Sequence, residues 1–155
     1  MENALSRIRS IADYQFGKGV GAKLFPENVD IIYSKATGRI RYLYLDGERL
    51  ATLRPTDGLL SLSLTAARLV AENRDFTNIV TVQNEVSEII ADGGDVFAVH
   101  VITVNAEVHA KDEVIILDED HHVLAVGRAL LSAVEMQAFK RGVAVKVRRG
   151  SAKES

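Results

Sequence analysis

The chain has 155 residues, of which 47% are hydrophobic and 26% charged, and its formal net charge is −2. These values are typical of globular proteins, and the length suits one ordinary domain or two small ones. No apolar run approaches the roughly 18 residues that a membrane span needs, which excludes a transmembrane protein. Because cysteine is absent, disulfide frameworks, thiol catalysis and cysteine-based metal sites are excluded, and a cytoplasmic location is expected.

The first half of the sequence predicts a helix followed by an antiparallel sheet. Apolar residues recur at helical spacing from Asn3 to Phe16, and Gly17 is a natural helix stop. The glycine run 17–21 predicts a flexible loop. Strands are expected at 29–33, 40–45, 49–53 and 60–63, with a second helix at 65–73.

A polar stretch at 71–75 places the expected domain boundary, with one domain at 1–75, a second at 76–150 and a frayed tail at 151–155. Strands are expected in the second domain at 76–82, 96–103, 113–117, 123–127 and 143–147. Asn84 is expected to cap a short helix that Gly93-Gly94 ends, and Ser132 with Glu135 forms a capping box for another helix. This pattern predicts a small, partly open barrel.

No group of residues has the spacing of a catalytic or cofactor site. The run 17–21 lacks the spacing of both a dinucleotide fingerprint and a P-loop, and no serine stands in a nucleophile elbow. His121 and His122 follow the acidic residues 118–120, which allows a weak surface metal site, although a polar turn explains the same residues. We predict no catalytic residue, no cofactor and no metal.

The segment from Lys140 to Arg149 holds five basic residues and no acidic one, within a half of the chain that is acidic as a whole. A basic patch on an acidic background is a candidate site for an anion such as nucleic acid. A solvated strand edge protected by basic side chains would have the same composition. Charge alone leaves both interpretations open.

The segment 113–129, which reads E-V-I-I-L-D-E-D-H-H-V-L-A-V-G-R-A, resembles the PUA domain, an RNA-binding module of pseudouridine synthases and archaeosine tRNA-guanine transglycosylases. The closing segment 142–147 and the upstream segment 90–98 extend this resemblance to about residues 76–150. Segments 11–17, 24–29 and 45–55 are similar to the domain that precedes PUA in archaeal archaeosine transglycosylase and archaeosine synthase.

The resemblance implies an α+β protein, in which an N-terminal antiparallel sheet with flanking helices precedes a PUA-type, partly open β-barrel. It implies a non-catalytic RNA-binding protein, namely a tRNA-binding accessory module of archaeosine modification, because the catalytic barrel of those enzymes and its cysteine-based zinc site are absent. The implied partners are structured RNA, above all tRNA, and a separate catalytic subunit, with no membrane. Two alternatives remain open: a protein-interaction subunit that completes a split transglycosylase or synthase, and an RNA-modifying enzyme in its own right.

The resemblance also implies where RNA is contacted: on the short helix, the glycine turn, the following strand, the G-R-A motif and the last strand. On this chain these positions are Asn84, Ser87, Gly93, Gly94, Val96, Phe97, Ala98, His100, Arg128, Lys146, Arg148 and Arg149.

Overall fold

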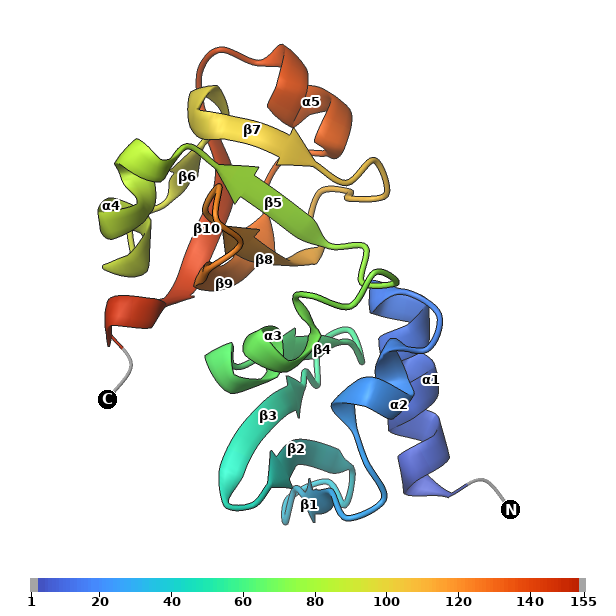
Figure 1. The fold of residues 1–155 in the computed structure, drawn as a ribbon. Helices are drawn as coiled ribbons and strands as arrows, with labels where there is room; N and C mark the ends of the chain where they lie inside the picture. The colour runs from blue at the N-terminus through green and yellow to red at the C-terminus, as the bar shows by residue number, and fades with distance from the viewer. Residues whose placement is uncertain (1–2, 154–155) are drawn as a thin grey trace. The chain divides into compact units, whose positions relative to one another are not determined.

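The computed structural model describes residues 3–153, and the chain divides into two compact units after Phe76. The first unit contains a four-stranded antiparallel sheet and the second a six-stranded, barrel-like sheet, which confirms the expected α+β class (Figure 1). Within residues 3–153, no helix has both the length and the apolar character needed to cross a bilayer.

The first unit contains three helices and four strands. They are α1 (Ala4–Phe16), α2 (Val20–Leu24), β1 (Asp30–Tyr33), β2 (Ile40–Leu45), β3 (Glu48–Leu53), β4 (Leu60–Leu62) and α3 (Leu64–Val70). The strands lie in the order β1-β2-β3-β4, and every neighbouring pair is antiparallel. The meander predicted from the turn residues is therefore confirmed.

Helix α1 packs into the core of this unit along one face. Asn3 caps the helix by accepting a hydrogen bond from the Ser6 backbone nitrogen at 2.6 Å. Ile8, Ala12 and Phe16 are fully buried, as their spacing of four residues requires. The ring of Phe16 stacks on that of Phe76, with centroids 5.1 Å apart, so Phe76 packs with the first unit although it follows the polar stretch.

The expected flexible loop at 17–21 is wrong, because α2 begins at Val20. Gly19 adopts a φ of +89° and turns the chain into this helix. Gly21 lies so close to α1 that a Cβ there would collide with the carbonyl oxygen of Arg9. Its backbone nitrogen also donates to the Asp13 carboxylate at 2.6 Å. The glycine therefore serves a close approach between two helices rather than flexibility.

The second unit contains six strands with short helices between them. They are β5 (Ile79–Val82), η1 (Asn84–Val86), α4 (Ser87–Ala91), β6 (Val96–Phe97), η2 (Ala98–His100), β7 (Val101–Val104), β8 (Glu113–Leu117), β9 (Val123–Ala129), α5 (Ala133–Ala138), β10 (Val143–Gly150) and η3 (Ser151–Lys153). The strand order is β6-β10-β9-β8-β5-β7, with β5 and β8 parallel and the other pairs antiparallel. The predicted capping box of α5 is present.

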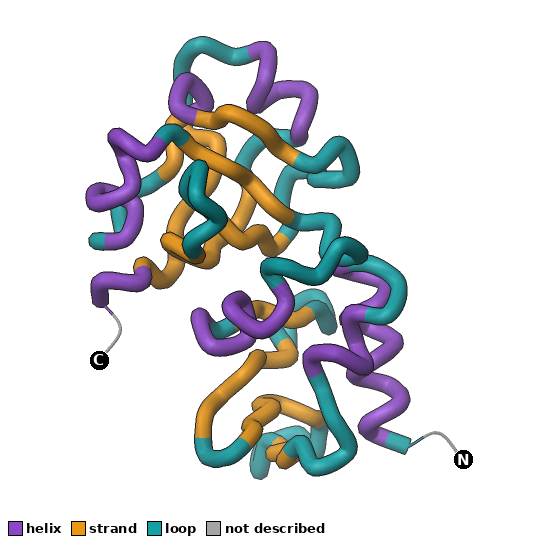
Figure 2. The backbone as a smooth tube through the Cα atoms, viewed as in Figure 1, coloured by secondary structure: helices purple, strands orange, loops and turns teal. Residues whose placement is uncertain are grey.

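The single strand expected at 96–103 is wrong, because η2 interrupts it (Figure 2). β6 pairs with β10 at one edge of the sheet, whereas β7 pairs with β5 at the opposite edge. The chain must bend between these edges, and η2 provides the bend. Periodicity cannot reveal this, because it depends on how the barrel closes.

The expected frayed tail also needs correction. β10 continues to Gly150, and residues 151–153 form the turn of helix η3. Residues 154 and 155 lie outside the described part of the chain.

Candidate nucleic-acid interface

The basic strand β10 ends against the glycine turn that follows α4 (Figure 1). A Cβ on Gly150 would collide with the carbonyl oxygen of Ala91 and lie 2.7 Å from the Gly93 nitrogen. Only a glycine permits this approach of the strand to the turn. Arg149, the preceding residue, is exposed and forms no ion pair within residues 3–153. An exposed arginine thus directly precedes the glycine at which the strand meets the turn.

The glycine turn has the geometry expected for a helix stop. Gly93 has a φ of +102°, and its nitrogen donates to the Ile90 carbonyl at 2.9 Å. The nitrogen of Gly94 donates to the Ile89 carbonyl at 2.9 Å. Nothing lies within 4 Å of the position of a Cβ on Gly93. The turn is thus open on one side, and a sugar–phosphate chain can approach its backbone closely.

Arg128 and Lys146 form the next part of this basic surface. They are directly opposite each other on β9 and β10, so their side chains lie on the same face of the sheet. Both are exposed. Lys146 makes an ion pair with Asp95 at 3.4 Å, and the same carboxylate accepts from the Val147 nitrogen at 3.0 Å. An exposed pair of this kind contributes about 0–1 kcal/mol, so Lys146 can exchange Asp95 for a phosphate.

Arg148 has a structural partner that sequence reasoning missed. Its guanidinium forms a two-pronged ion pair with the carboxylate of Glu113, whose side chain is fully buried. A buried carboxylate without a cation would be strongly destabilising. Arg148 therefore has an internal structural role, while its contact with RNA stays a prediction. A glutamate that opens the otherwise apolar run E-V-I-I-L was the available signal.

Four residues of the expected contact set lie in β6 and η2, and two of them are buried. Val96 and Ala98 belong to the hydrophobic core of the second unit, so their side chains are withdrawn from any RNA contact. Phe97 is 47% exposed, and its ring meets that of His100 edge to face at 6.4 Å between centroids. Within β6, Val96 faces the core and Phe97 the surface, because alternate residues of a strand face opposite sides.

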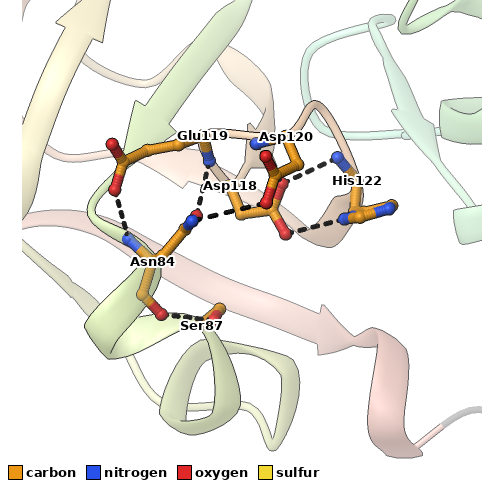
Figure 3. A network of polar contacts seen from close by, with 6 residues as sticks. All are labelled: Asn84, Ser87, Asp118, Glu119, Asp120 and His122. Carbon is orange, nitrogen blue, oxygen red and sulfur yellow. Dashed lines mark hydrogen bonds and ion pairs between the residues drawn. The ribbon is translucent and has the colours of Figure 1, made fainter.

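Asn84 does not cap the helix with its side chain but binds the acidic turn that joins β8 to β9 (Figure 3). Its Oδ1 accepts from the Glu119 nitrogen at 2.8 Å, while its own backbone nitrogen donates to Glu119 Oε2 at 2.9 Å. Its Nδ2 donates to Asp120 at 3.4 Å. Ser87 turns inward and donates to the Asn84 carbonyl at 2.5 Å. This end of the helix therefore faces carboxylates, which repel phosphate.

The acidic turn is held together by Asp118, whose side chain is largely buried (Figure 3). Asp118 accepts from the backbone nitrogens of Asp120 and His122 and from the His122 ring, each at 2.9 Å. The hydrogen bond and the charge of Asp118 raise the pKa of His122. Burial opposes ionisation of Asp118, but the hydrogen bonds from His122 and Asp120 lower its pKa overall.

Asp118, Asp120 and His122 each place a potential metal-ligand atom within 4.8 Å of the others. The oxygens of Asp118 are already occupied by hydrogen bonds of the turn. These bonds explain the convergence of the three groups without an ion.

The two units each match a known family. Residues 6–76 match the patch-forming domain C2 of tRNA-guanine transglycosylase, and residues 78–151 match the PUA domain. The chain is 42% identical over 147 residues to tRNA-guanine(15) transglycosylase of Methanothermobacter thermautotrophicus, covering 94% of this chain and 22% of the relative. For the Pyrococcus furiosus enzyme the identity is 41% over 150 residues, covering 96% and 25%. The chain thus spans about a quarter of the length of the curated relatives it matches.

Solved structures with low sequence identity share the fold. A hypothetical protein from Pyrococcus horikoshii aligns with a TM-score of 0.77 at 22% identity, covering 97% of this chain and 90% of that one. A conserved PUA domain protein from Thermoplasma acidophilum aligns with a TM-score of 0.67 at 20% identity, covering 98% and 93%. The chain therefore combines a PUA-domain match over residues 78–151 with a match to the patch-forming domain C2 over residues 6–76, and it resembles the C-terminal region of archaeal tRNA-guanine(15) transglycosylases.

Proposed function

We propose that this chain is a non-catalytic RNA-binding protein that holds tRNA for a separate modifying enzyme, in keeping with archaeosine modification. The observation that carries the proposal is the meeting of β10 with the open turn at Gly93, in a strand that carries the exposed Lys146 and Arg149. Arginine forks suit the phosphate oxygens of RNA, and the open glycine turn lets a sugar–phosphate chain come close. The tRNA-guanine transglycosylase relatives supply the choice of tRNA.

Binding of purified tRNA tests the proposal directly, measured by fluorescence anisotropy at several salt concentrations. Two or three phosphate contacts, from Arg149, Lys146 and Arg128, give a log–log salt slope of about −1.4 to −2.7. An unstructured RNA of equal length serves as the control and should bind more weakly. Absence of tRNA binding at low salt would overturn the proposal. Guanine exchange into tRNA by the chain alone would overturn its non-catalytic part.

A protein-interaction role is the second candidate. It is favoured by the coverage of the relatives, in which the two matched domains belong to a longer enzyme. In that case the chain would bind a catalytic subunit and leave tRNA recognition to it. Tight tRNA binding by the chain alone, with the salt slope given above, would decide for the RNA-binding role.

A further inference from the structure

A cationic pocket of about 440 Å³ lies within the first unit. Arg7 of α1 lines this pocket. Arg39, just before β2, and Arg41, within β2, line it as well. The loop 54–58 after β3 contributes Arg54. Four arginines from three separate parts of the fold thus converge on one concavity. A concave surface of one charge sign concentrates the field for an anion.

The one acidic residue among the described lining residues is already neutralised. The Asp57 carboxylate forms an ion pair with Nη2 of Arg54 at 3.0 Å and accepts a hydrogen bond from its Nε at 3.2 Å. Arg7, Arg39 and Arg41 form no ion pair within residues 3–153, and the Arg41 guanidinium lies 5.4 Å from the centre of the Tyr42 ring. Three guanidiniums therefore remain for a ligand. Arginine forks match phosphate oxygens better than any other side chain does.

Two hydroxyl groups of the turn between β1 and β2 add donors to the pocket. Ser34 Oγ accepts from the Thr37 nitrogen at 3.4 Å, and Thr37 Oγ1 accepts from the Arg39 nitrogen at 3.3 Å. Both hydroxyls act as acceptors within the turn, so their O–H groups are left to donate. The turn is closed by the Ser34 nitrogen, which donates to the Arg39 carbonyl at 2.8 Å.

The rest of the lining is apolar, with Ile40, Leu53 and Pro55. Ile40 and Leu53 are each only 7% exposed and form the floor. A bare phosphate ion would leave this floor empty, whereas a nucleotide has a ribose and a base to cover it. The volume lies within the roughly 300–1,000 Å³ of small-molecule sites. We infer that this pocket binds a nucleotide, with its phosphate on the arginines and its ribose or base against the apolar floor.

The nucleotide has two possible sources, an RNA chain or a free 5′-mononucleotide, and the first rests on the proposed function. The test titrates the full-length chain with 5′-AMP, with a five-nucleotide RNA and with inorganic phosphate, followed by amide NMR signals. Binding should perturb the signals of 34–41 and 54–58, and inorganic phosphate should bind more weakly than 5′-AMP. Perturbation by the RNA alone assigns the pocket to an RNA chain, and perturbation by 5′-AMP assigns it to a mononucleotide.

The decisive variant combines Arg39→Gln with Arg41→Gln, which leaves the Arg54–Asp57 pair intact. Loss of two charge-assisted contacts should weaken binding at least about tenfold. Arg49→Gln is the matched control, because Arg49 is exposed on β3 and does not line the pocket. Unchanged binding in the double variant, or no binding of 5′-AMP and the RNA at all, would overturn the inference. An unfolding curve for each variant separates these results from a folding defect.

The outcome for tRNA separates this inference from the proposed function. Binding of 5′-AMP at the pocket by a chain that does not bind tRNA would leave the pocket standing and remove the proposed function. The reverse outcome is binding of tRNA with equal affinity in the double variant, while 5′-AMP and the short RNA leave the amide signals of 34–41 and 54–58 unchanged. It would remove the pocket and leave the proposed function standing.

Discussion

The guanidinium of Arg148 and the carboxylate of Glu113 form an ion pair across two strands that are not neighbours in the sheet, β10 and β8. The two side chains differ in exposure, because Glu113 is fully buried whereas 40% of the Arg148 side chain is exposed. Arg128 on the intervening strand β9 lies opposite both Glu113 and Lys146. The ion pair therefore links β10 directly to β8 across β9.

Removal of the cation should cost more stability than removal of the acid. Arg148→Met removes the cation that faces the buried carboxylate and should destabilise the fold by roughly 2–3 kcal/mol, below the full value for buried pairs because Arg148 is partly exposed. Glu113→Leu leaves a cation that can reach water, so this variant should lose less folding stability than Arg148→Met. The double variant should regain much of the stability. Denaturant unfolding measures all three, and an unaltered Arg148→Met midpoint would show that the pair contributes little.

Arg149 should act on RNA without this cost in stability. Arg149→Gln should weaken binding to structured RNA of any sequence and make the salt slope shallower by about 0.7–0.9, because one phosphate contact is lost. Lys140→Gln is the matched control, since it removes a charge from the same basic segment at a position outside the proposed interface. Equal losses in both variants would point to general charge attraction rather than a local site.

The turn around Asp118 should depend on pH through its contact with His122. The raised pKa of His122 means that its stabilising contribution is complete below about 6.5, the pKa of an unfolded histidine, and disappears as pH rises through the folded value. The lowered pKa of Asp118 means that its contribution is present above the ordinary value of 3.8 and is lost as pH falls through the folded value. The turn should thus be most stable between the ordinary pKa of an aspartate, 3.8, and that of a histidine, about 6.5.

NMR titration of His122 provides the measurement. Asp118→Asn should return the pKa of His122 toward its ordinary value, because it removes the charge and weakens the hydrogen bond. Asp120→Asn should lower it less, since Asp120 acts through charge alone and is the smallest of the causes. A pKa of His122 that stays raised in Asp118→Asn would contradict this account.

The sequence predicts those elements whose cause is local. The β2 and β8 bounds match the predicted 40–45 and 113–117, because the apolar runs and their flanking turns are complete in the sequence. The helix α2 and the break at η2 were missed because their causes are distant: the approach of Gly21 to Arg9, and the closure of the barrel.

The candidate site shows the same division. The basic character of β10 is visible in the sequence, but the partner of Arg148 lies 35 residues away on β8. Asn84 likewise binds Glu119, again 35 residues distant. The approach of Gly150 to Ala91 is also absent from the sequence pattern, since only the folded strand brings the two together. Which basic residues are available to a ligand is therefore a property of tertiary pairing.

The second unit should fold without the first. It has its own hydrophobic core, to which β5, β8, β9 and β10 all contribute, and domains of about 60 residues often fold alone. A fragment of residues 77–155 should give a folded circular dichroism spectrum and a cooperative thermal transition. Val80→Asp, which places a charge in the core, is the control and should abolish both. An unfolded fragment beside a folded full-length chain would show that the two units depend on each other.

Three glycine variants should separate backbone strain from the junction of β10 with the turn. Gly93→Ala and Gly142→Ala both force alanine into a positive φ, +102° and +97°, with open space around the added Cβ. Both should lose about 1 kcal/mol of stability. Because Gly142 lies in the loop before β10, only Gly93→Ala should also weaken RNA binding.

Gly150→Ala should have the larger effect, because its Cβ would collide with the carbonyl oxygen of Ala91. Either the end of β10 or the turn at Gly93 must move, at a cost of about 1–3 kcal/mol. The displacement separates Arg149 from the turn, so RNA affinity should fall further than in Gly93→Ala at equal folded fraction. Measurement of anisotropy well below each variant's melting temperature excludes unfolding as the cause. Normal RNA affinity in a destabilised Gly150→Ala would mean that the junction supports the fold alone and that RNA binds elsewhere.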